Sequence, residues 1–142
     1  MEKSNLQETR EKIWNHLSGD HYAKHLGIKV LEWGDGRAVA ELDVSEFMLN
    51  AHGTVHGAVI FALADTVFAV ACNSYGKTAV ALSMNIGFLA PGFLGNRLRA
   101  TAEEVKAGGK TGWYRISVEN EEGLVAQLDA LAYRKNQPFI ND

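Results

Sequence analysis

Residues 55–75, VHGAVIFALADTVFAVACNSY, decide the fold of this chain. They contain its longest apolar stretch, residues 55–72, and on a helix their apolar side chains would cover nearly every face. A helix of this kind is buried on most of its sides, and its alanines allow other backbone to approach closely. His56 and Asp65 interrupt the stretch, so it predicts a long central core helix and not a membrane span. Gly76 marks its expected end.

Strands are predicted after this helix, and short helices and strands before it. The later strands are expected over residues 78–89, 97–106, 111–119 and 124–134, with breaks at Pro91-Gly92 and Gly108-Gly109. We expect these four strands to form an antiparallel meander, because a Gly-Gly pair between strands is a good hairpin signal. The earlier elements are a helix over 5–17, a helix over 21–26, strands over 28–31 and 37–44, and a loop over 45–54.

An antiparallel sheet curled around one buried helix is an α+β design, the hotdog architecture. The whole chain, residues 1–142, is short enough to form one such domain, with a helical segment over 5–26 at its start. Its 46% hydrophobic and 22% charged residues are ordinary for a globular protein. A net charge of −3 without a polybasic run argues against a nucleic-acid partner and against binding to a membrane surface.

One cysteine, Cys72, excludes an intramolecular disulfide framework and favours a reducing compartment. The first residues are polar and lack the apolar core of a signal peptide. We therefore expect a cytoplasmic protein.

Asp65 is the strongest candidate for chemistry, because it is the only Asp, Glu, Lys or Arg in residues 55–75. A charge in an apolar helix is unfavourable unless it is paired or functional. Asp65 is then either a general base or nucleophile, or a structural carboxylate held by a hydroxyl or a backbone amide. The sequence leaves both explanations open.

The start of the helix is the second candidate. Gly57 lies in its first turn, where backbone N–H groups lack intrahelical partners and favour a developing oxyanion. Gly57 and Asp65 are eight residues apart, roughly 12 Å along a helix, so one chain can hardly supply both to one carbonyl. If both act, two chains must share the site. We expect a dimer whose interface lies along the helix start and the strand over 79–89.

Histidine and cysteine are the other candidates for metal binding or nucleophilic chemistry. His52 and His56 are four apart, but no third ligand follows at the spacing of a metal site. Cys72 lies nearly on the same helix face as Asp65, without an activating base in sequence, and is better explained as a small buried residue. We therefore expect no metal and no cofactor.

Two stretches together resemble the PaaI-type thioesterases of the hotdog superfamily. They are Asn50-Ala-His-Gly-Thr-Val-His-Gly-Ala58 with Ala62-Leu-Ala-Asp-Thr66, and Met84-Asn-Ile-Gly-Phe-Leu-Ala-Pro-Gly92. The resemblance covers roughly residues 20–135 and implies hydrolysis of acyl-CoA, often with aryl or arylacetyl groups, by a homotetramer built from dimers. Ala58 stands where the family commonly has a second glycine, and because alanine is small we expect little effect.

The resemblance also implies roles for single residues. Asp65 matches the catalytic carboxylate, and Gly57 matches the backbone donor that polarises the thioester carbonyl, with the two supplied by opposite subunits. Asn50 and His56 match residues that line and orient the site. An assisting hydroxyl is implied as well, for which the candidates are Ser83 and Thr66.

Two other functions compete with hydrolysis. Hotdog hydratases and dehydratases pair an Asp with a His in an Asp-x-Asn-Pro-x-x-His type of motif, but no Asn-Pro occurs in this chain. The chain could also bind acyl-CoA without turning it over, which the retained Asp65 argues against.

Overall fold

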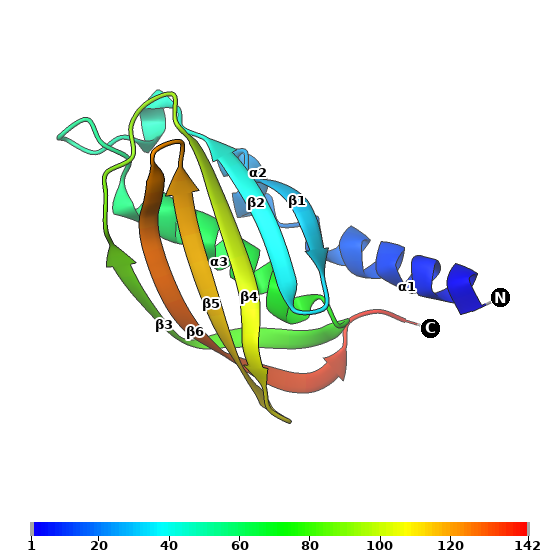
Figure 1. Ribbon diagram of the computed structural model, residues 1–142. Helices are drawn as coiled ribbons and strands as arrows, with labels where there is room; N and C mark the ends of the chain where they lie inside the picture. Colours follow the sequence, from blue (N-terminus) through cyan, green and yellow to red (C-terminus); the bar gives the residue numbers. More distant parts are fainter. Residues whose placement is uncertain (1, 142) are drawn as a thin grey trace.

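The computed structural model describes residues 2–141, in which one six-stranded antiparallel sheet wraps around a long helix (Figure 1). The strand order across the sheet is β1-β2-β4-β5-β6-β3. In chain order the elements are α1 (Glu2–Leu17), α2 (His21–Leu26), β1 (Lys29–Gly34), β2 (Arg37–Asp43), the 3-10 turn η1 (Glu46–Met48), α3 (Gly57–Asn73), β3 (Lys77–Phe88), β4 (Arg97–Ala107), β5 (Thr111–Asn120) and β6 (Gly123–Pro138). This is the predicted α+β hotdog fold.

Helix α3 confirms the predicted central helix, and its two ends lie two residues inside the predicted ones. His56 caps the N-terminus, and Gly76 turns the chain into β3 at φ 85°. The buried side of α3 packs on the inner face of the sheet, where Phe68 meets Tyr114 edge-on with ring centroids 5.3 Å apart. Most of the apolar core therefore lies between this helix and the sheet.

The predicted four-strand meander is correct for β4, β5 and β6 and wrong for β3. Strand β3 pairs with β6, and β4 pairs with β2 on its other side, so β3 forms an edge of the sheet. The chain after β3 passes Pro91-Gly92 and crosses the end of the barrel-like sheet before it enters β4 (Figure 1). The alternation of side chains along a strand determines which face is buried, but it does not determine which strands pair with it. The sequence pattern is therefore the same whether β3 pairs with β4 or with β6.

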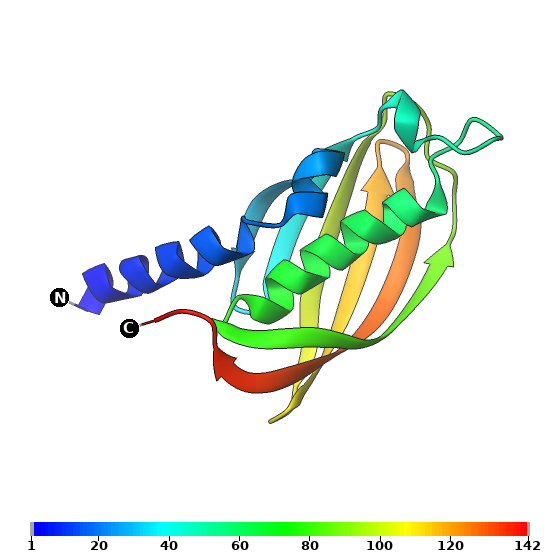
Figure 2. The same ribbon diagram turned by 180° about the vertical axis from the view of Figure 1, so that it is seen from behind.

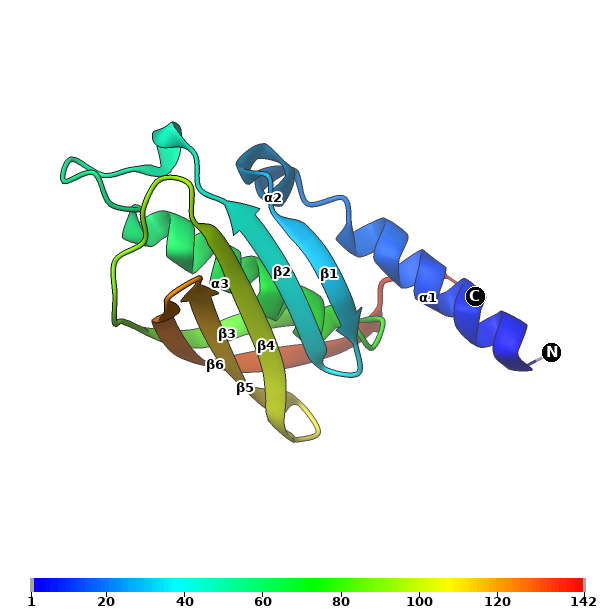
Figure 3. The same cartoon turned by 45° about the horizontal axis from the view of Figure 1, so that its top comes forward.

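The N-terminal helices lie on the side of the molecule beside β1 (Figure 3). Helix α1 projects past the sheet. Its second half is anchored by the buried side chain of Ile13 and by Arg10, whose Cζ lies 4.1 Å from the centroid of the Trp33 ring. Helix α2 ends at Gly27 as predicted, with φ 83°. Strand β6 runs to Pro138, four residues beyond the predicted end at Arg134. No helix within residues 2–141 is long and apolar enough to cross a membrane.

Candidate active site

One face of α3 is left uncovered by the rest of the chain, and the candidate site lies along it (Figure 2). Its residues recur every four positions: Gly57, Phe61, Asp65 and Ala69. Asp65 is exposed in the single chain and the other three are half-buried. The face is bordered by β3 on one side and by α2 on the other (Figure 2). Apart from exposed Ala58 in the first turn, the rest of the helix is buried, so this stripe is where α3 can meet a ligand or another chain.

Asp65 carries a carboxylate without a structural purpose inside the chain. Among residues 2–141 no hydrogen bond or ion pair reaches it. Surrounding protein partly removes it from water, and this desolvation raises the pKa of Asp65; the Asp20 carboxylate raises it further. The structural explanation, a carboxylate held by a hydroxyl or an amide, therefore finds no support in the described contacts. A partly desolvated, unpaired carboxylate is suited to act as a base or nucleophile.

The first turn of α3 offers one free backbone donor. His56 Nδ1 accepts a hydrogen bond from Ala58 N–H at 3.1 Å, and the His56 carbonyl accepts from Val59 N–H at 2.9 Å and Ile60 N–H at 3.3 Å. In the part of the chain that the structure describes, Gly57 N–H is the donor of this turn that has no acceptor. Helix N-termini carry partial positive charge, so this amide is positioned for an oxyanion.

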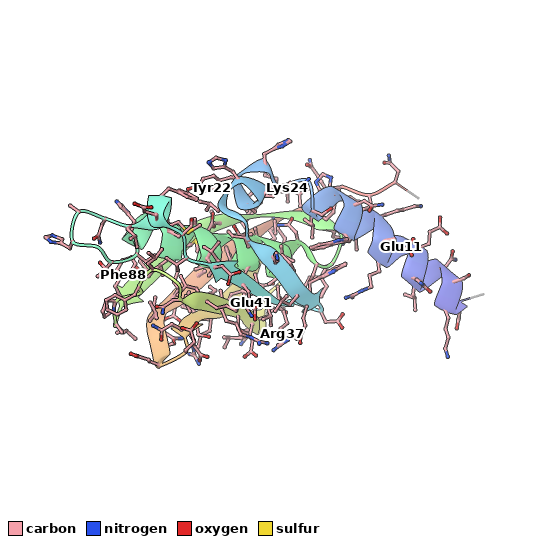
Figure 4. All side chains as sticks on the ribbon, turned by 90° about the horizontal axis from the view of Figure 1, so that it is seen from above. Glu11, Tyr22, Lys24, Arg37, Glu41 and Phe88 are labelled. Carbon is pink, nitrogen blue, oxygen red and sulfur yellow. The ribbon has the colours of Figure 1, made fainter. Side chains whose placement is uncertain are left out.

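Gly57 also lies close to the side chain of Phe88. A Cβ built on this residue would lie 3.2 Å from the ring of Phe88, at the end of β3. Phe88 is exposed and lies at the same end of the molecule as the loop that leads into α3 (Figure 4). A larger residue at Gly57 would push against this ring and occupy the space in front of the free amide.

Asn50 organises the projecting loop that precedes α3. Its Oδ1 accepts hydrogen bonds from His52 N–H at 2.9 Å and Thr54 N–H at 3.2 Å, and its Nδ2 donates to Thr54 Oγ1 at 2.8 Å. One hydrogen of the Asn50 amide is left for a ligand. His52 lies exposed in the loop.

The two hydroxyl candidates are placed differently. Thr66 is buried next to Asp65 on α3, and its Oγ1 donates to the Ala62 carbonyl at 2.8 Å. Ser83 is exposed on β3 opposite Leu131, so it lies on the other face of the strand from Met84, which packs on the core. A single chain therefore brings Thr66 beside Asp65 and does not bring Ser83 there.

Cys72 is buried, and burial raises the pKa of its thiol to about 12, which describes an unreactive side chain. Within residues 2–141 no group of three or more His, Cys, Asp or Glu side chains is arranged so that it could hold a metal ion.

Asp20 is the residue that sequence reasoning missed. Its side chain caps α2 by accepting a hydrogen bond from Ala23 N–H at 3.0 Å, and the same carboxylate lies close enough to raise the pKa of Asp65. The sequence contains a signal for the cap, since Asp is a preferred N-cap residue. Its proximity to Asp65 arises only when α2 packs against α3.

Comparison with known proteins agrees with this fold. The family described as "Thioesterase superfamily" matches residues 52–127. The chain is 47% identical over 121 residues to the acyl-coenzyme A thioesterase PaaI of Escherichia coli, covering 82% of this chain and 86% of that protein. The structure of the E. coli PaaI protein from the phenylacetic acid degradation operon matches with a TM-score of 0.86 and 39% identity, over 92% of this chain and 98% of that one.

A hypothetical thioesterase of Streptococcus pneumoniae, solved with coenzyme A, also matches, with a TM-score of 0.81 and 25% identity over 88% of this chain and 98% of that one. The free amide at the start of α3 and the unpaired carboxylate of Asp65 both lie within the residues that the family match covers. By sequence, fold and extent of the match, the chain belongs to the thioesterase superfamily, as a hotdog-fold relative of PaaI.

Proposed function

We propose that this chain hydrolyses acyl-CoA thioesters to a free acid and coenzyme A. The observation that carries the proposal is the pair of unpaired groups on the open face of α3: the Gly57 amide and the Asp65 carboxylate. An amide at a helix start stabilises negative charge on a carbonyl oxygen, and a partly desolvated carboxylate activates a nucleophile. Names of relatives support the acyl-CoA substrate, since the E. coli relative is an acyl-coenzyme A thioesterase.

In the proposed reaction the Gly57 N–H donates a hydrogen bond to the thioester oxygen as the tetrahedral intermediate forms. Asp65 either takes a proton from the attacking water or attacks the carbonyl carbon itself, giving an anhydride that water then cleaves. In both routes the carbon–sulfur bond breaks and the coenzyme A thiolate leaves. Water supplies the oxygen that the acid gains, and the products are one carboxylic acid and one thiol.

The spacing of the two groups supports a site that two chains share. Helix α3 runs unbroken from Gly57 past Asp65, so they remain roughly 12 Å apart along its axis. Both must approach within ~3 Å of the reacting atoms. We therefore propose a two-fold dimer in which Gly57 of one chain faces Asp65 of the other, which gives two composite sites.

Strand β3 supports this dimer, because it is an edge strand with unpaired backbone groups on its outer side. Several of its large apolar side chains, and the next residue along the chain, are exposed in the single chain: Val80, Leu82, Phe88 and Leu89. Exposed apolar patches of this kind usually mark an interface. Pairing of dimers into a tetramer is proposed on the family resemblance.

The remaining site residues are assigned supporting roles. We propose that His56 holds the helix start through its hydrogen bond with Ala58 N–H, and that the spare Asn50 amide hydrogen contacts the thioester or the leaving group. Thr66 would line the site beside Asp65, and Ser83 would reach it only through the dimer. We place the enzyme in the cytoplasm, since its one thiol is a free buried cysteine.

The direct test is Asp65→Asn, followed by the release of thiol from a panel of aryl, short and long acyl-CoA substrates. Loss of a positioned base should lower kcat by ~10² or more while the fold is kept, since the side chain keeps its size. Asp35→Asn is a matched control, because Asp35 is an exposed turn residue with φ 51°, a conformation that asparagine also accepts.

Near-normal turnover by a folded Asp65→Asn variant would remove Asp65 from the mechanism. A wild-type protein that binds acyl-CoA tightly and releases no thiol from any member of the panel would instead favour a binding module.

A further inference from the structure

A hollow of about 350 Å³ lies at the start of α3, and Gly57 forms part of its wall. We call it the helix-start hollow. It is lined by residues from the start of α3 and from the end of β3 with the segment that follows: Val55, Gly57, Ile60, Phe88, Leu89, Ala90 and Pro91. None of these side chains carries a polar atom, so a polar group in the hollow has to come from the backbone.

The Gly57 N–H is the backbone donor that this hollow offers. Leu89 and Ala90 N–H both donate to the Val125 carbonyl, at 2.8 and 3.2 Å, and are therefore occupied. Among the described wall residues outside β3, Gly57 carries the one N–H without an acceptor. A hydrogen bond to a developing oxyanion is strongest where water is excluded, because the local dielectric is low there.

The ring of Phe88 packs against Gly57. A Cβ built on Gly57 would lie 3.2 Å from Phe88 Cζ and 3.3 Å from Phe88 Cε1, so the ring lies close to the helix backbone. The Phe88 side chain is 54% exposed, and the ring therefore lies at the mouth of the hollow, with part of it toward Gly57 and the rest toward solvent. The two hydrogen bonds to Val125 fix the chain directly after Phe88 and hold the ring in this place.

We propose that Phe88 is a positioning residue for the oxyanion, an inference that rests on the proposed thioester hydrolysis. Its ring covers the Gly57 N–H on the solvent side, so that this amide meets the thioester oxygen with water excluded. Water that reached the amide would occupy the hydrogen bond that the oxyanion needs, and the transition state would lose stabilisation.

Phe88 also adds exposed apolar surface at the proposed dimer contact, and a purely structural role there predicts a different result. Loss of an interface side chain weakens assembly and lowers the concentration of active dimer. Loss of water exclusion instead lowers the turnover of dimers that are fully formed. Phe88 and Gly57 belong to the same chain, so they act from the same side of a shared site, opposite the Asp65 of the other chain.

The first experiment compares kcat and KM in variants of Phe88. Phe88→Ala should lower kcat about tenfold, less than the ~10²-fold loss expected when an oxyanion donor is removed. KM should change less than about threefold, because the lost interaction is made in the transition state. Phe88→Leu keeps an apolar cover and should hold kcat within about threefold of the wild type.

Phe93→Ala is the matched control, since Phe93 is 46% exposed and lies outside the hollow. Its kcat should equal that of the wild type. Light scattering ensures that all variants are compared as the same oligomer. If Phe88→Ala does not fold, Phe88→Val replaces it, because valine is smaller than leucine and suits a strand.

The second experiment mixes subunits to identify the site that Phe88 serves. In a hybrid of Phe88→Ala with Asp65→Ala, one site combines intact Phe88 and Gly57 from one chain with Asp65 from the other, so about half the wild-type rate should return. In a hybrid of Phe88→Ala with Gly57→Val, no site has both Phe88 and Gly57 intact, and the rate should not exceed that of Phe88→Ala. A general loss of stability would not depend on the choice of partner variant.

A kcat within about twofold of the wild type in Phe88→Ala, or a loss confined to KM, would overturn the role of Phe88. A hybrid with Asp65→Ala that is no faster than Phe88→Ala would also overturn it. Either result leaves the proposed hydrolysis intact as long as turnover still requires Asp65. Absence of thiol release by the wild type from every acyl-CoA would reject the proposed function itself.

Discussion

The two ends of α3 are built in opposite ways. At the C-terminal end nearly every polar group is bonded. Asn73 donates to the Ala79 carbonyl at 3.1 Å and accepts from Ala79 N–H at 2.9 Å, and Ser74 Oγ both donates to the Ala71 carbonyl and accepts from Gly36 N–H. Near this end Glu104 holds Tyr114, Arg134 and Tyr75 in one network. At the N-terminal end a backbone amide is free and apolar side chains face outward.

This difference separates stability from reactivity. The C-terminal half of the helix is fixed by bonds to β3 and to the sheet, which holds the other half in a defined position without using its groups. Gly57 and Asp65 can then remain unpaired without loosening the fold. Breaking the network at the C-terminal end should reduce stability and leave turnover nearly unchanged, whereas removing the Asp65 carboxylate or blocking the Gly57 amide should reduce turnover with little loss of stability.

The largest stability effect is expected from Arg134→Met. Arg134 Nη2 lies 2.7 Å from Glu104 Oε2, and both side chains are only 15% exposed. Removing the cation leaves the Glu104 carboxylate in this site without its charged partner, which should lower the free energy of unfolding by about 3 kcal/mol. Urea denaturation measures the loss, and kcat per folded molecule should stay within about twofold of the wild type if the two ends are independent.

Arg115→Met is the matched control for that change. Arg115 lies 3.8 Å from Asp129, but the two side chains are 61% and 47% exposed. An exposed pair of this kind contributes about 0–1 kcal/mol. Equal destabilisation by the two variants would mean that burial of the Glu104 network is not what stabilises this end.

A smaller effect is expected at the helix start from His56→Ala. This change removes the side chain that caps Ala58 N–H and should lower stability by about 1 kcal/mol. His56→Asn should recover most of the loss, because asparagine is a good N-cap residue. His52→Ala, in the exposed part of the preceding loop, should leave the melting temperature unchanged. If His56→Asn is as unstable as His56→Ala, the cap does not explain the role of His56.

The smallest and most specific effect concerns pH. Desolvation and the Asp20 carboxylate hold the pKa of Asp65 above its ordinary value of 3.8, so kcat/KM should fall on acidification at a pH above that value. Asp20→Asn keeps the cap of α2 and removes the charge, which should lower the pKa of Asp65 and move the acid limb to lower pH. An acid limb unmoved by Asp20→Asn would show that the Asp20 carboxylate does not raise the pKa of Asp65, and that desolvation alone sets it.

The raised pKa of Asp65 also predicts how stability depends on pH. Its effect has the opposite sign to that of an aspartate whose pKa is lowered by folding. Because the folded-state pKa is raised, the stabilisation due to protonated Asp65 is fully present below the unfolded pKa and is lost as the pH rises through the folded pKa. Asp65→Asn cannot ionise, so it should be more stable than the wild type at neutral pH and should lose this advantage in acid. A variant less stable than the wild type at neutral pH would indicate a structural role for Asp65.

Much of this arrangement could be predicted from local sequence patterns. The apolar run predicted α3, and Gly108-Gly109 predicted the turn between β4 and β5. The position of β3 beside β6 was missed, because alternation along a strand is the same whichever strand lies next to it. The proximity of Asp20 to Asp65 and the Glu104–Arg134 pair were missed for a related reason, since each joins residues at least 30 positions apart.

The central claim is that Gly57 and Asp65 act on one substrate from two chains, and subunit mixing tests it most directly. Asp65→Ala and Gly57→Val homodimers should each be nearly inactive, because one lacks the carboxylate and the other blocks the free amide. In a two-fold hybrid of the two, one site regains both intact groups, so each hybrid dimer should show about half the wild-type rate. Verified hybrid dimers that remain as inactive as their parents would contradict the shared site.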